Sequence, residues 1–421
     1  MNERLLLTLK DEGYETPTPI QEQTIPAILQ GRDVIGCAQT GTGKTAAFAL
    51  PIIQLISNKK HSRSRWGTRC LILTPTRELA AQILESFRTY GRHVRLKQTA
   101  VFGGVGQRPQ VNSLSHGVDV LIATPGRLLD LMEQGYAHFD DLELFVLDEA
   151  DRMLDMGFIR DVERIIRALP TKRQSLFFSA TMSQGVMRLS REILSDPVEA
   201  SVAPSATTVE LVNQHVYFVD RENKFKLLKS ILQDDDVDKA LVFARTKRGA
   251  DRIAKQLNRE RVSADAIHGN KSQGARTNAM NNFRSGRSRV IIATDLAARG
   301  IDVDGITHVI NYELPNEPET YVHRIGRTAR AGASGSAVSF CDLDETIYLH
   351  DIEKLTRQGI SVVEEHPLHS EKAHAAKREL EAGRTPHGIK PPHKRSGGNR
   401  GGFRRGPRRT AKPKHKLRRR R

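Results

Sequence analysis

The chain has 421 residues, and at about 150 residues per domain this length predicts two domains and an additional segment. Hydrophobic residues make up 38% of it, which is enough for stable cores, but no apolar run reaches the roughly 18 to 20 residues that cross a bilayer. The first ten residues lack the cationic and apolar regions of a signal peptide. These features argue against a membrane or exported protein, and we expect a soluble, cytoplasmic one without a membrane partner.

The three cysteines, Cys37, Cys70 and Cys341, are too few and too scattered for a disulfide framework or a zinc site. The net charge of +17 is unevenly placed. Residues 369–421 hold 19 Lys/Arg and 3 Asp/Glu, whereas the preceding residues hold 47 and 46. Because an Arg-, Lys-, Gly- and Pro-rich segment buries little apolar surface, we predict that 369–421 is a disordered tail. It is either a site for nucleic acid, whose phosphates the Arg and Lys side chains would bind, or a solubilising extension.

Short apolar runs alternate with helical patterns, which predicts an α/β fold with parallel sheets covered by helices on both faces. In the first unit, residues 1–203, the predicted strands are 34–37, 70–74, 99–102, 118–123, 144–148 and 175–179, with helices over 45–56 and 78–90 among others. Small and polar residues indicate a linker over 204–213. A second unit, 214–368, follows with strands predicted at 214–219, 240–243, 264–267, 290–294 and 307–311.

The first unit carries a glycine-rich phosphate loop directly after its first strand. The loop is Ala38-Gln39-Thr40-Gly41-Thr42-Gly43-Lys44-Thr45, in which backbone N–H groups approach phosphate oxygens, the lysine supplies charge and the threonine hydroxyl binds Mg²⁺. Ala38 stands where the consensus has Gly. The loop predicts binding of a nucleoside triphosphate, and the second unit lacks such a loop.

The apolar run 144–147 delivers Asp148-Glu149-Ala150-Asp151 to the end of a predicted buried strand. We expect Asp148 to hold Mg²⁺, largely through water, and Glu149 to polarise the attacking water. A solvated helix cap is the alternative, but a cap has no need of four apolar residues leading into it. The two motifs together predict triphosphate hydrolysis.

Further motifs follow in a fixed order from Gly13 to Arg330. They are Gly13-Tyr14-Glu15-Thr16-Pro17-Thr18-Pro19-Ile20-Gln21, Pro75-Thr76-Arg77-Glu78-Leu79-Ala80, Gly103-Gly104, Thr124-Pro125-Gly126-Arg127, Ser179-Ala180-Thr181, Phe243-Ala244-Arg245-Thr246, His268-Gly269, residues 293–302 and residues 323–330. With the phosphate loop and the carboxylates, this set resembles the DEAD-box RNA helicases of superfamily 2, which have two tandem RecA-like domains. Its short loops look most like the bacterial RhlE-type branch.

The resemblance implies an RNA-stimulated ATPase with ATP and Mg²⁺ as cofactors. It assigns catalysis to Lys44, Asp148 and Glu149 of the first unit, with Arg327 and Arg330 of the second as arginine fingers. It assigns ATP contacts to Tyr14, Thr16, Gln21, Ala38, Gln39, Thr40, Gly41, Thr42, Gly43, Lys44, Thr45 and Asp302. Gln21 would pair with the adenine edge. The family usually also has an aromatic residue well upstream of Gly13, and without it we expect weaker ATP binding.

RNA would be held through its backbone, without readout of bases. The residues implied for this are Pro75, Arg77, Gly104, Thr124, Arg127, Arg245, Gly269, Thr294 and Arg299. Coupling of the ATP state to strand separation would rest on Asp151, Ser179, Thr181 and His323, with hydrogen bonds joining Asp151 to the Ser-Ala-Thr motif. The implied partners are single-stranded RNA and short duplexes, and also ribosomal precursors or RNA-degradation complexes.

Since the implied site is split between two units, hydrolysis requires their closure, and ATP and RNA should bind with positive coupling. We expect a monomer that locally unwinds short duplexes and remodels RNA, as in ribosome biogenesis. Two alternatives stay open. One is an RNA chaperone in which ATP regulates the binding of RNA, and the other is a DNA helicase.

Overall fold

The computed structural model describes residues 2–39, 41–58, 67–202, 212–298, 303, 305–329, 335–384 and 386. We call the described residues up to 202 the N-terminal lobe and those from 212 onwards the C-terminal lobe. In these ranges, no helix combines the length and the apolar character needed to cross a bilayer.

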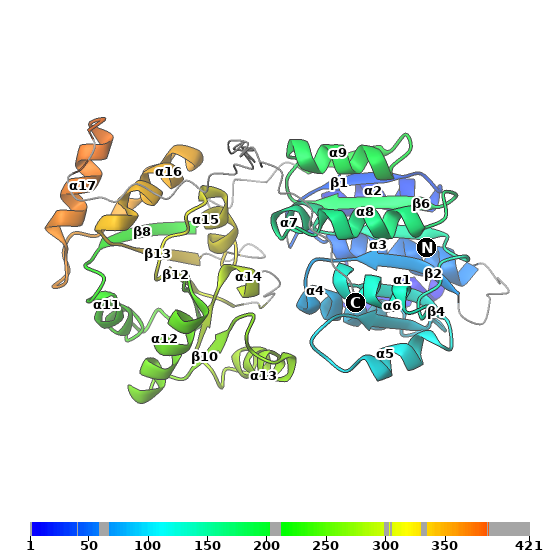
Figure 1. The fold of residues 1–421 in the computed structure, drawn as a ribbon, viewed down its shortest axis with the longest axis horizontal. Helices are drawn as coiled ribbons and strands as arrows, with labels where there is room; N and C mark the ends of the chain where they lie inside the picture. The colour runs from blue at the N-terminus through cyan, green and yellow to red at the C-terminus, as the bar shows by residue number, and fades with distance from the viewer. Residues whose placement is uncertain are drawn as a thin grey trace, which may run out of the picture. The chain divides into compact units, whose positions relative to one another are not determined.

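The N-terminal lobe is built on a seven-stranded sheet in which every pairing is parallel, in the order β3-β4-β2-β5-β6-β1-β7 (Figure 1). Central strands such as β2 and β5 are buried along their whole length, as expected where helices cover both faces. The strands are β1 Val34–Cys37, β2 Thr68–Leu73, β3 Gln98–Val101, β4 Val118–Ala123, β5 Leu144–Leu147, β6 Gln174–Ser179 and β7 Val198–Ser201.

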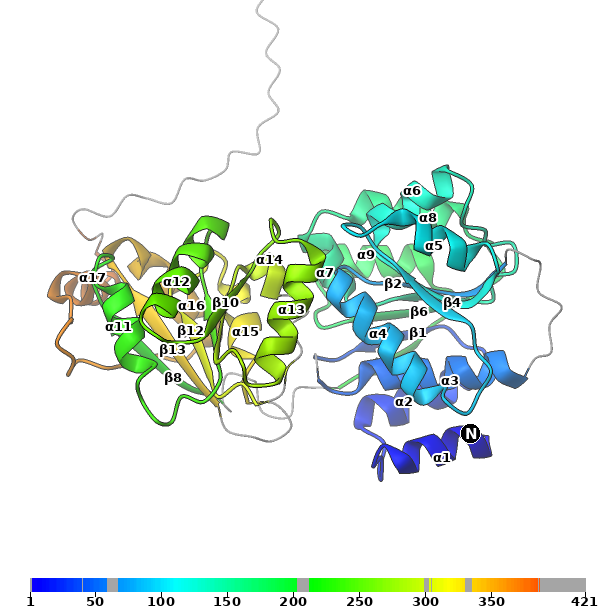
Figure 2. The same cartoon turned by 90° about the horizontal axis from the view of Figure 1, so that it is seen from below.

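The described residues of this lobe form nine helices, which lie on both faces of the sheet (Figure 2). Alternate strand residues divide between the faces: Cys70 and Ile72 pack into one core, Leu71 and Leu73 into the other. The helices are α1 Glu3–Asp11, α2 Pro19–Leu29, α3 Lys44–Asn58, α4 Arg77–Tyr90, α5 Gln107–Leu114, α6 Pro125–Glu133, α7 Ala150–Asp155, α8 Ile159–Ala168 and α9 Gln184–Ile193.

The C-terminal lobe repeats this plan with a second seven-stranded parallel sheet, in the order β10-β11-β9-β12-β13-β8-β14. Its strands are β8 Val212–Phe218, β9 Ala240–Phe243, β10 Ala264–Ile267, β11 Val290–Ala293, β12 His308–Asn311, β13 Gly335–Cys341 and β14 Ser361–Val362. Its described helices are α11 Lys224–Ile231, α12 Lys247–Arg259, α13 Gln273–Arg284, α14 Asp295–Ala298, α15 Pro318–Ile325, the short 3-10 helix η1 Leu343–Glu345, α16 Thr346–Thr356 and α17 Glu371–Glu381.

The two parallel sheets with flanking helices confirm the predicted fold class, and each predicted strand is present with shifts of one or two residues at its ends. Three strands were not predicted. Strand β13 is rich in Gly, Ser and Ala, β7 contains a glutamate, and β14 has only two residues. Strand β8 begins at Val212, two residues inside the predicted linker 204–213.

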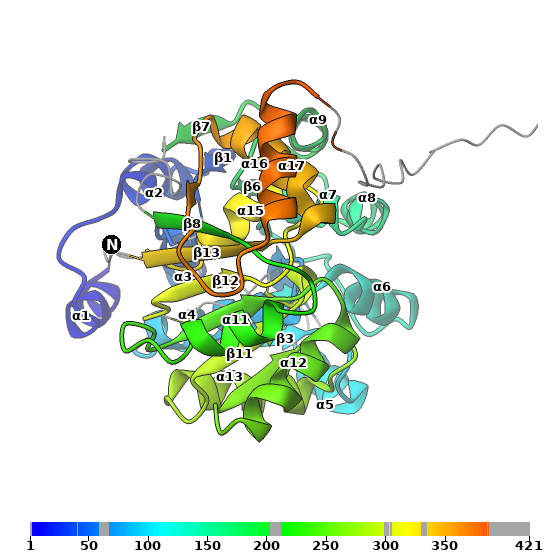
Figure 3. The same ribbon diagram turned by 90° about the vertical axis from the view of Figure 1, so that its left-hand side faces the viewer.

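The prediction of a disordered tail over 369–421 is wrong for its first part. Helix α17 folds beside α16 (Figure 3), with Ala373 and Ala376 buried and Lys377 in an ion pair with Glu353 at 3.0 Å. The basic composition of the whole segment concealed this short amphipathic helix. The charge excess lies further on, because 15 Lys/Arg and no Asp/Glu follow residue 384. Residues 387–421 lie outside the described part of the chain.

Candidate functional site

The functional residues of the N-terminal lobe lie at the carboxyl ends of its parallel strands. In the strand order, β6 lies between β5 and β1, so the loops that follow these three strands share one half of the sheet edge. The loops that follow β2, β3 and β4 share the other half. Ligands of open parallel sheets bind at such an edge.

The phosphate loop follows β1 and leads directly into α3. Gly41 and Gly43 have φ of +90° and +92°, a conformation that favours glycine. The side chain of Lys44 is buried, and its Nζ donates to the carbonyl of Ala38 at 2.6 Å, while Thr42 Oγ1 donates to the carbonyl of Gln39 at 2.7 Å. These bonds fix the loop in a compact turn. Thr40 lies outside the described residues.

The Gln21 side chain joins helix α2 to the phosphate loop. Its Nε2 donates to the carbonyl of Gly43 at 3.2 Å, and its Oε1 accepts from the backbone N–H of Thr18 at 3.0 Å. The predicted adenine-binding amide is therefore held beside the loop. Tyr14 lies elsewhere, since its hydroxyl is 2.8 Å from that of Tyr90 on α4, and Thr16 is exposed.

The carboxylates follow β5, so they lie where the carboxyl ends of the parallel strands meet, as predicted. The backbone N–H of Glu149 donates to Asp148 Oδ1 at 3.0 Å. Burial raises the pKa of the Asp148 carboxyl to about 7; Lys44 opposes this shift, and the charges of Glu149 and Asp151 reinforce it. A cation bound near a carboxylate with such a raised pKa stabilises the ionised form of that carboxylate.

Glu149 has a left-handed backbone, with φ of 54°, at the junction of β5 and α7. Its carboxylate forms a buried ion pair with Arg152, at 2.8 Å. The orientation of the predicted water-polarising group is thus set by the backbone turn and by a cation one helical turn later.

Asp151 joins the carboxylate loop to the loop after β6. Its Oδ2 accepts hydrogen bonds from the backbone N–H of Thr181 at 3.1 Å and from Thr181 Oγ1 at 3.3 Å, and its own N–H donates to Ser179 Oγ at 3.3 Å. The predicted hydrogen bonds between Asp151 and the Ser-Ala-Thr motif are therefore present. These hydrogen bonds join the two loops.

The predicted RNA-binding residues of this lobe meet at the other half of the edge. A Cβ atom on Gly104 would overlap the guanidinium of Arg77, so the two motifs are in direct contact. Arg127 Nη2 lies 3.4 Å from the carbonyl of Val105. Pro75 follows β2 and Thr124 immediately precedes α6, which begins at Pro125. Loops after β2, β3 and β4 therefore form one surface with two arginines.

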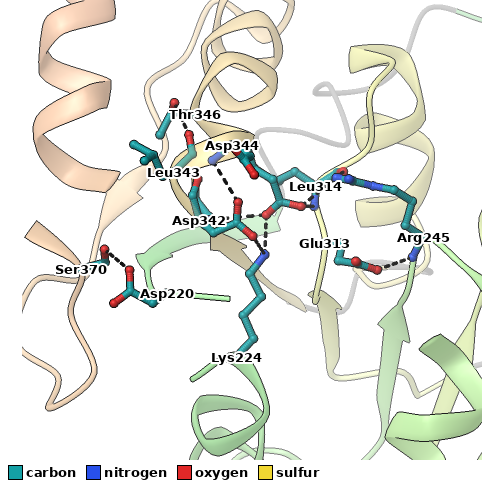
Figure 4. A network of polar contacts seen from close by, with 12 residues as sticks. Asp220, Lys224, Arg245, Glu313, Leu314, Asp342, Leu343, Asp344, Thr346 and Ser370 are labelled. Atoms are coloured by element: carbon teal, nitrogen blue, oxygen red, sulfur yellow. Dashed lines mark hydrogen bonds and ion pairs between the residues drawn. The ribbon is translucent and has the colours of Figure 1, made fainter. Parts of the chain in front are cut away.

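In the C-terminal lobe, the exposed Arg245 is bound to a network of charges whose other members are mostly buried (Figure 4). Its Nη2 donates to Glu345 Oε1 at 2.8 Å and to the carbonyl of Leu314 at 3.0 Å. Glu345 and Asp342 also hold Lys224, which is 1% exposed. Burial alone would lower the pKa of Lys224, but the two carboxylates outweigh it and raise the pKa. The predicted RNA contact Arg245 thus has a structural partner within its own lobe.

The remaining predicted residues of this lobe follow β10, β11 and helix α15. Thr294 precedes α14, and its carbonyl accepts from the N–H groups of Ala297 and Ala298, both at 2.9 Å. Gly269 lies against the Lys247 side chain. Arg327 follows α15, and its Nε donates to the carbonyl of His323 at 3.3 Å. Arg299, Asp302 and Arg330 lie outside the described residues.

Both lobes match helicase families. Residues 18–189 match the DEAD/DEAH box helicase family, and residues 223–332 match the helicase conserved C-terminal domain family. Over 357 residues the chain is 43% identical to the ATP-dependent RNA helicase CshA of Limosilactobacillus reuteri, covering 85% of this chain and 71% of that protein. The chain belongs to the DEAD-box ATP-dependent RNA helicases.

Other relatives of this DEAD-box helicase agree. CshA of Listeria monocytogenes is 41% identical over 360 residues, covering 85% of this chain and 68% of the relative. Among solved structures, "S. cerevisiae Dbp5 bound to RNA and ADP BeF3" is 29% identical with a TM-score of 0.76, covering 91% of this helicase and 97% of that chain. Mss116p bound to ssRNA and AMP-PNP is 28% identical with a TM-score of 0.77, covering 91% and 83%. The helicase is an ATPase whose activity RNA stimulates.

Two arginines of the helicase were not predicted as site residues. Arg152 holds Glu149, and its position three residues after that carboxylate was a usable signal. Arg324 binds Asp295 with two hydrogen bonds, of 2.5 and 2.9 Å, and lies 4.8 Å from the ring centroid of Phe243. In the sequence, Arg324 and Arg327 look alike, because both lie in the same arginine-rich motif. Only the fold shows that Arg324 is the one that joins elements within the C-terminal lobe.

Proposed function

We propose that this helicase opens short RNA duplexes locally by closing its two lobes around ATP and RNA. The observation that carries the proposal is the divided sheet edge of the N-terminal lobe, with the phosphate loop and carboxylates on one half and Arg77, Gly104 and Arg127 on the other. Asp151 and Thr181 connect loops of the nucleotide half. Since Arg327 belongs to the C-terminal lobe, a complete hydrolytic site requires both lobes.

The nucleotide half fits a Mg²⁺ ion. Asp148 offers a buried carboxylate whose pKa burial raises, and Thr45 offers a hydroxyl in the first turn of α3. Hard oxygen ligands of this kind suit Mg²⁺. When bound, the ion would neutralise charge on the phosphates, while Lys44 binds phosphate and Glu149 orients the attacking water. The cation would also keep Asp148 ionised.

The proposal favours local opening over processive translocation. Between Asp302 and His323, the described residues fold into β12 and most of α15, and they include no hairpin that could split strands. A strand that is bent across the RNA-facing loops cannot stay in a regular duplex, so a few base pairs separate at a time. Release of the hydrolysis products then ends the cycle.

We further propose assignment to the RhlE-type branch, supported by the short loops between motifs, and action as a monomer, supported by the presence of both half-sites in one chain. Its substrates ATP and RNA favour a cytoplasmic enzyme. Ribosomal precursors and RNA-degradation complexes are the structured RNAs and RNA–protein complexes on which we expect it to act.

ATP turnover with matched oligomers tests the RNA specificity. We expect single-stranded RNA to raise kcat at least about tenfold above the value without nucleic acid, and DNA of the same sequence to have little effect, because only RNA offers 2′-hydroxyl groups. Equal stimulation by DNA would indicate a DNA helicase. Strand annealing that persists in a Glu149→Gln variant, together with no unwinding by the wild type, would favour the RNA chaperone.

A further inference from the structure

A cluster of imidazoles and carboxylates lies in the C-terminal lobe, where the end of β8 meets the start of α17. It comprises His369, Glu371 and His374, with Glu364 beside them. Two hydrogen bonds fix the start of α17 to the end of β8 and the residues that follow it. The Ser370 N–H donates to the carbonyl of Phe218 at 2.9 Å, and Ser370 Oγ donates to Asp220 at 2.7 Å (Figure 4). The cluster is therefore built on a rigid junction. None of these residues belongs to the ATP or RNA motifs.

The distances within the cluster match those between ligands of one metal ion. His369 Nε2 lies 3.3 Å from His374 Nδ1 and 3.8 Å from Glu371 Oε1, and one ligand atom from each residue lies within 4.8 Å of the others. Two nitrogens bound to tetrahedral Zn²⁺ at about 2.0–2.1 Å are separated by roughly 3.3–3.4 Å. The two imidazoles already have this spacing.

The orientation of His374 leaves the correct nitrogen for a metal. Its ring stacks on Phe218, with centroids 4.8 Å apart and an interplanar angle of 8°. On the other side of the ring, Nε2 lies 3.8 Å from Glu364 Oε1. With its proton on Nε2, toward this carboxylate, His374 would offer the lone pair of the opposite nitrogen, Nδ1, toward His369.

We propose that His369, His374 and Glu371 bind a Zn²⁺ ion, with water in the fourth position. Two imidazoles and one carboxylate suit Zn²⁺ better than Mg²⁺ or Ca²⁺, which prefer oxygen ligands. In the absence of metal, one of the two facing nitrogens can donate a hydrogen bond to the other. Zn²⁺ needs both lone pairs, so its binding would move that proton to the second nitrogen of the donating ring. The ion would join His369, which precedes α17, to the first turn of that helix. The basic segment that follows residue 384 begins beyond the end of the same helix.

Arg378 opposes the ion and provides a sharp test. Its Nη2 lies 3.3 Å from His374 Nδ1 and 3.4 Å from His374 Nε2, so that a positive charge stands next to the nitrogen that the metal would bind, and its side chain is exposed. Zn²⁺ binding must therefore displace this cation. An Arg378→Gln variant should bind Zn²⁺ more tightly than the wild type, which a purely structural pair of histidines does not predict.

The test titrates the full chain, first stripped of metal with a chelator, with Zn²⁺ alone in the presence of a competing indicator. We expect the wild type to bind one more equivalent than a His369→Gln/His374→Phe double variant. Glu364→Gln should weaken that equivalent about 10- to 100-fold, as for other groups that orient a metal-bound histidine. Bound Co²⁺ should give the visible absorption of a tetrahedral site in the wild type and lose it in the double variant.

His116→Ala, which removes an exposed imidazole of the N-terminal lobe, is the control and should keep the equivalent. RNA-stimulated ATP turnover will show whether the double variant is folded. If it is not, Glu371→Gln decides the matter, because this side chain is 85% exposed and its loss should weaken Zn²⁺ binding at least about tenfold without unfolding the lobe. Equal stoichiometry and affinity in the wild type and the Glu371→Gln variant would overturn the proposal.

Discussion

Glu149 combines a strained backbone conformation with a predicted role in catalysis. A non-glycine residue with φ of 54° costs about 1–3 kcal/mol relative to an ordinary conformation, and the structure holds it there between a buried strand and a buried ion pair with Arg152. A water-polarising group needs this kind of fixed placement.

Removal of Arg152 tests the importance of this ion pair. In an Arg152→Met variant, Glu149 is left as a buried carboxylate without its cation, so we expect the free energy of unfolding of the N-terminal lobe to fall by about 3 kcal/mol and ATPase kcat to fall at least tenfold. Urea unfolding and steady-state kinetics measure the two effects. Arg164→Met breaks an exposed pair with Glu133 and should change stability by less than about 1 kcal/mol. Equal effects of the two variants would contradict this role.

Asp148 should make stability depend on pH in the absence of nucleotide and divalent cation. Its pKa is about 7 in the folded protein and about 4 when unfolded, so the folded state binds the proton more tightly. The contribution of Asp148 to stability is therefore most favourable below about pH 4, and it is lost as pH rises through about 7.

An Asp148→Asn variant removes this loss. We expect it to match the wild type near pH 4 and to exceed the wild type at pH 8 in free energy of unfolding, with a ceiling of about 4 kcal/mol at about 1.4 kcal/mol per pKa unit. Urea unfolding at several pH values checks this, with the exposed Asp140→Asn as the control. A stability difference between Asp148→Asn and the wild type that does not change with pH would contradict the account.

At the level of elements, the start of α4 and the loop after β3 form one unit of the proposed RNA surface. Gly104 has φ of +80°, and a Cβ there would overlap the guanidinium of Arg77. We expect Gly104→Ala to displace Arg77 and to weaken RNA binding about tenfold, with little change in ATPase without RNA. Gly106→Ala is a matched control in the same loop, since φ is −55° and its Cβ would make only an ordinary contact with Pro109. Fluorescence anisotropy with labelled RNA compares them, and equal affinities would exclude the contact.

The elements that the sequence predicted are those with unbroken apolar runs, such as β5 and β11, because burial on both faces leaves a local signal. Strand β13 and helix α17 were missed since small residues and lysines carry little such signal. Motif order located the phosphate loop and the carboxylates. It could not distinguish Arg324 from Arg327, because which arginine meets Asp295 depends on how strands β11 and β12 are placed.

At the scale of the whole molecule, the corrected boundary of the basic segment changes how it should be tested. A truncation at Glu371 would remove α17 and expose buried parts of the C-terminal lobe. A truncation after Pro386 removes 15 Lys/Arg and leaves the described fold intact. We expect it to flatten the dependence of RNA affinity on salt and to leave ATPase without RNA unchanged. An unchanged salt dependence would make the segment merely solubilising.

If ATP and RNA each favour closure of the two lobes, they bind cooperatively. The most direct test is the RNA dissociation constant of a Glu149→Gln variant, which should retain ATP without turnover, measured with and without ATP. The account predicts RNA binding at least about tenfold tighter with ATP, equivalent to about 1.4 kcal/mol of coupling, and loss of this gain when Arg327→Ala is added. An RNA affinity that ATP leaves unchanged would contradict it.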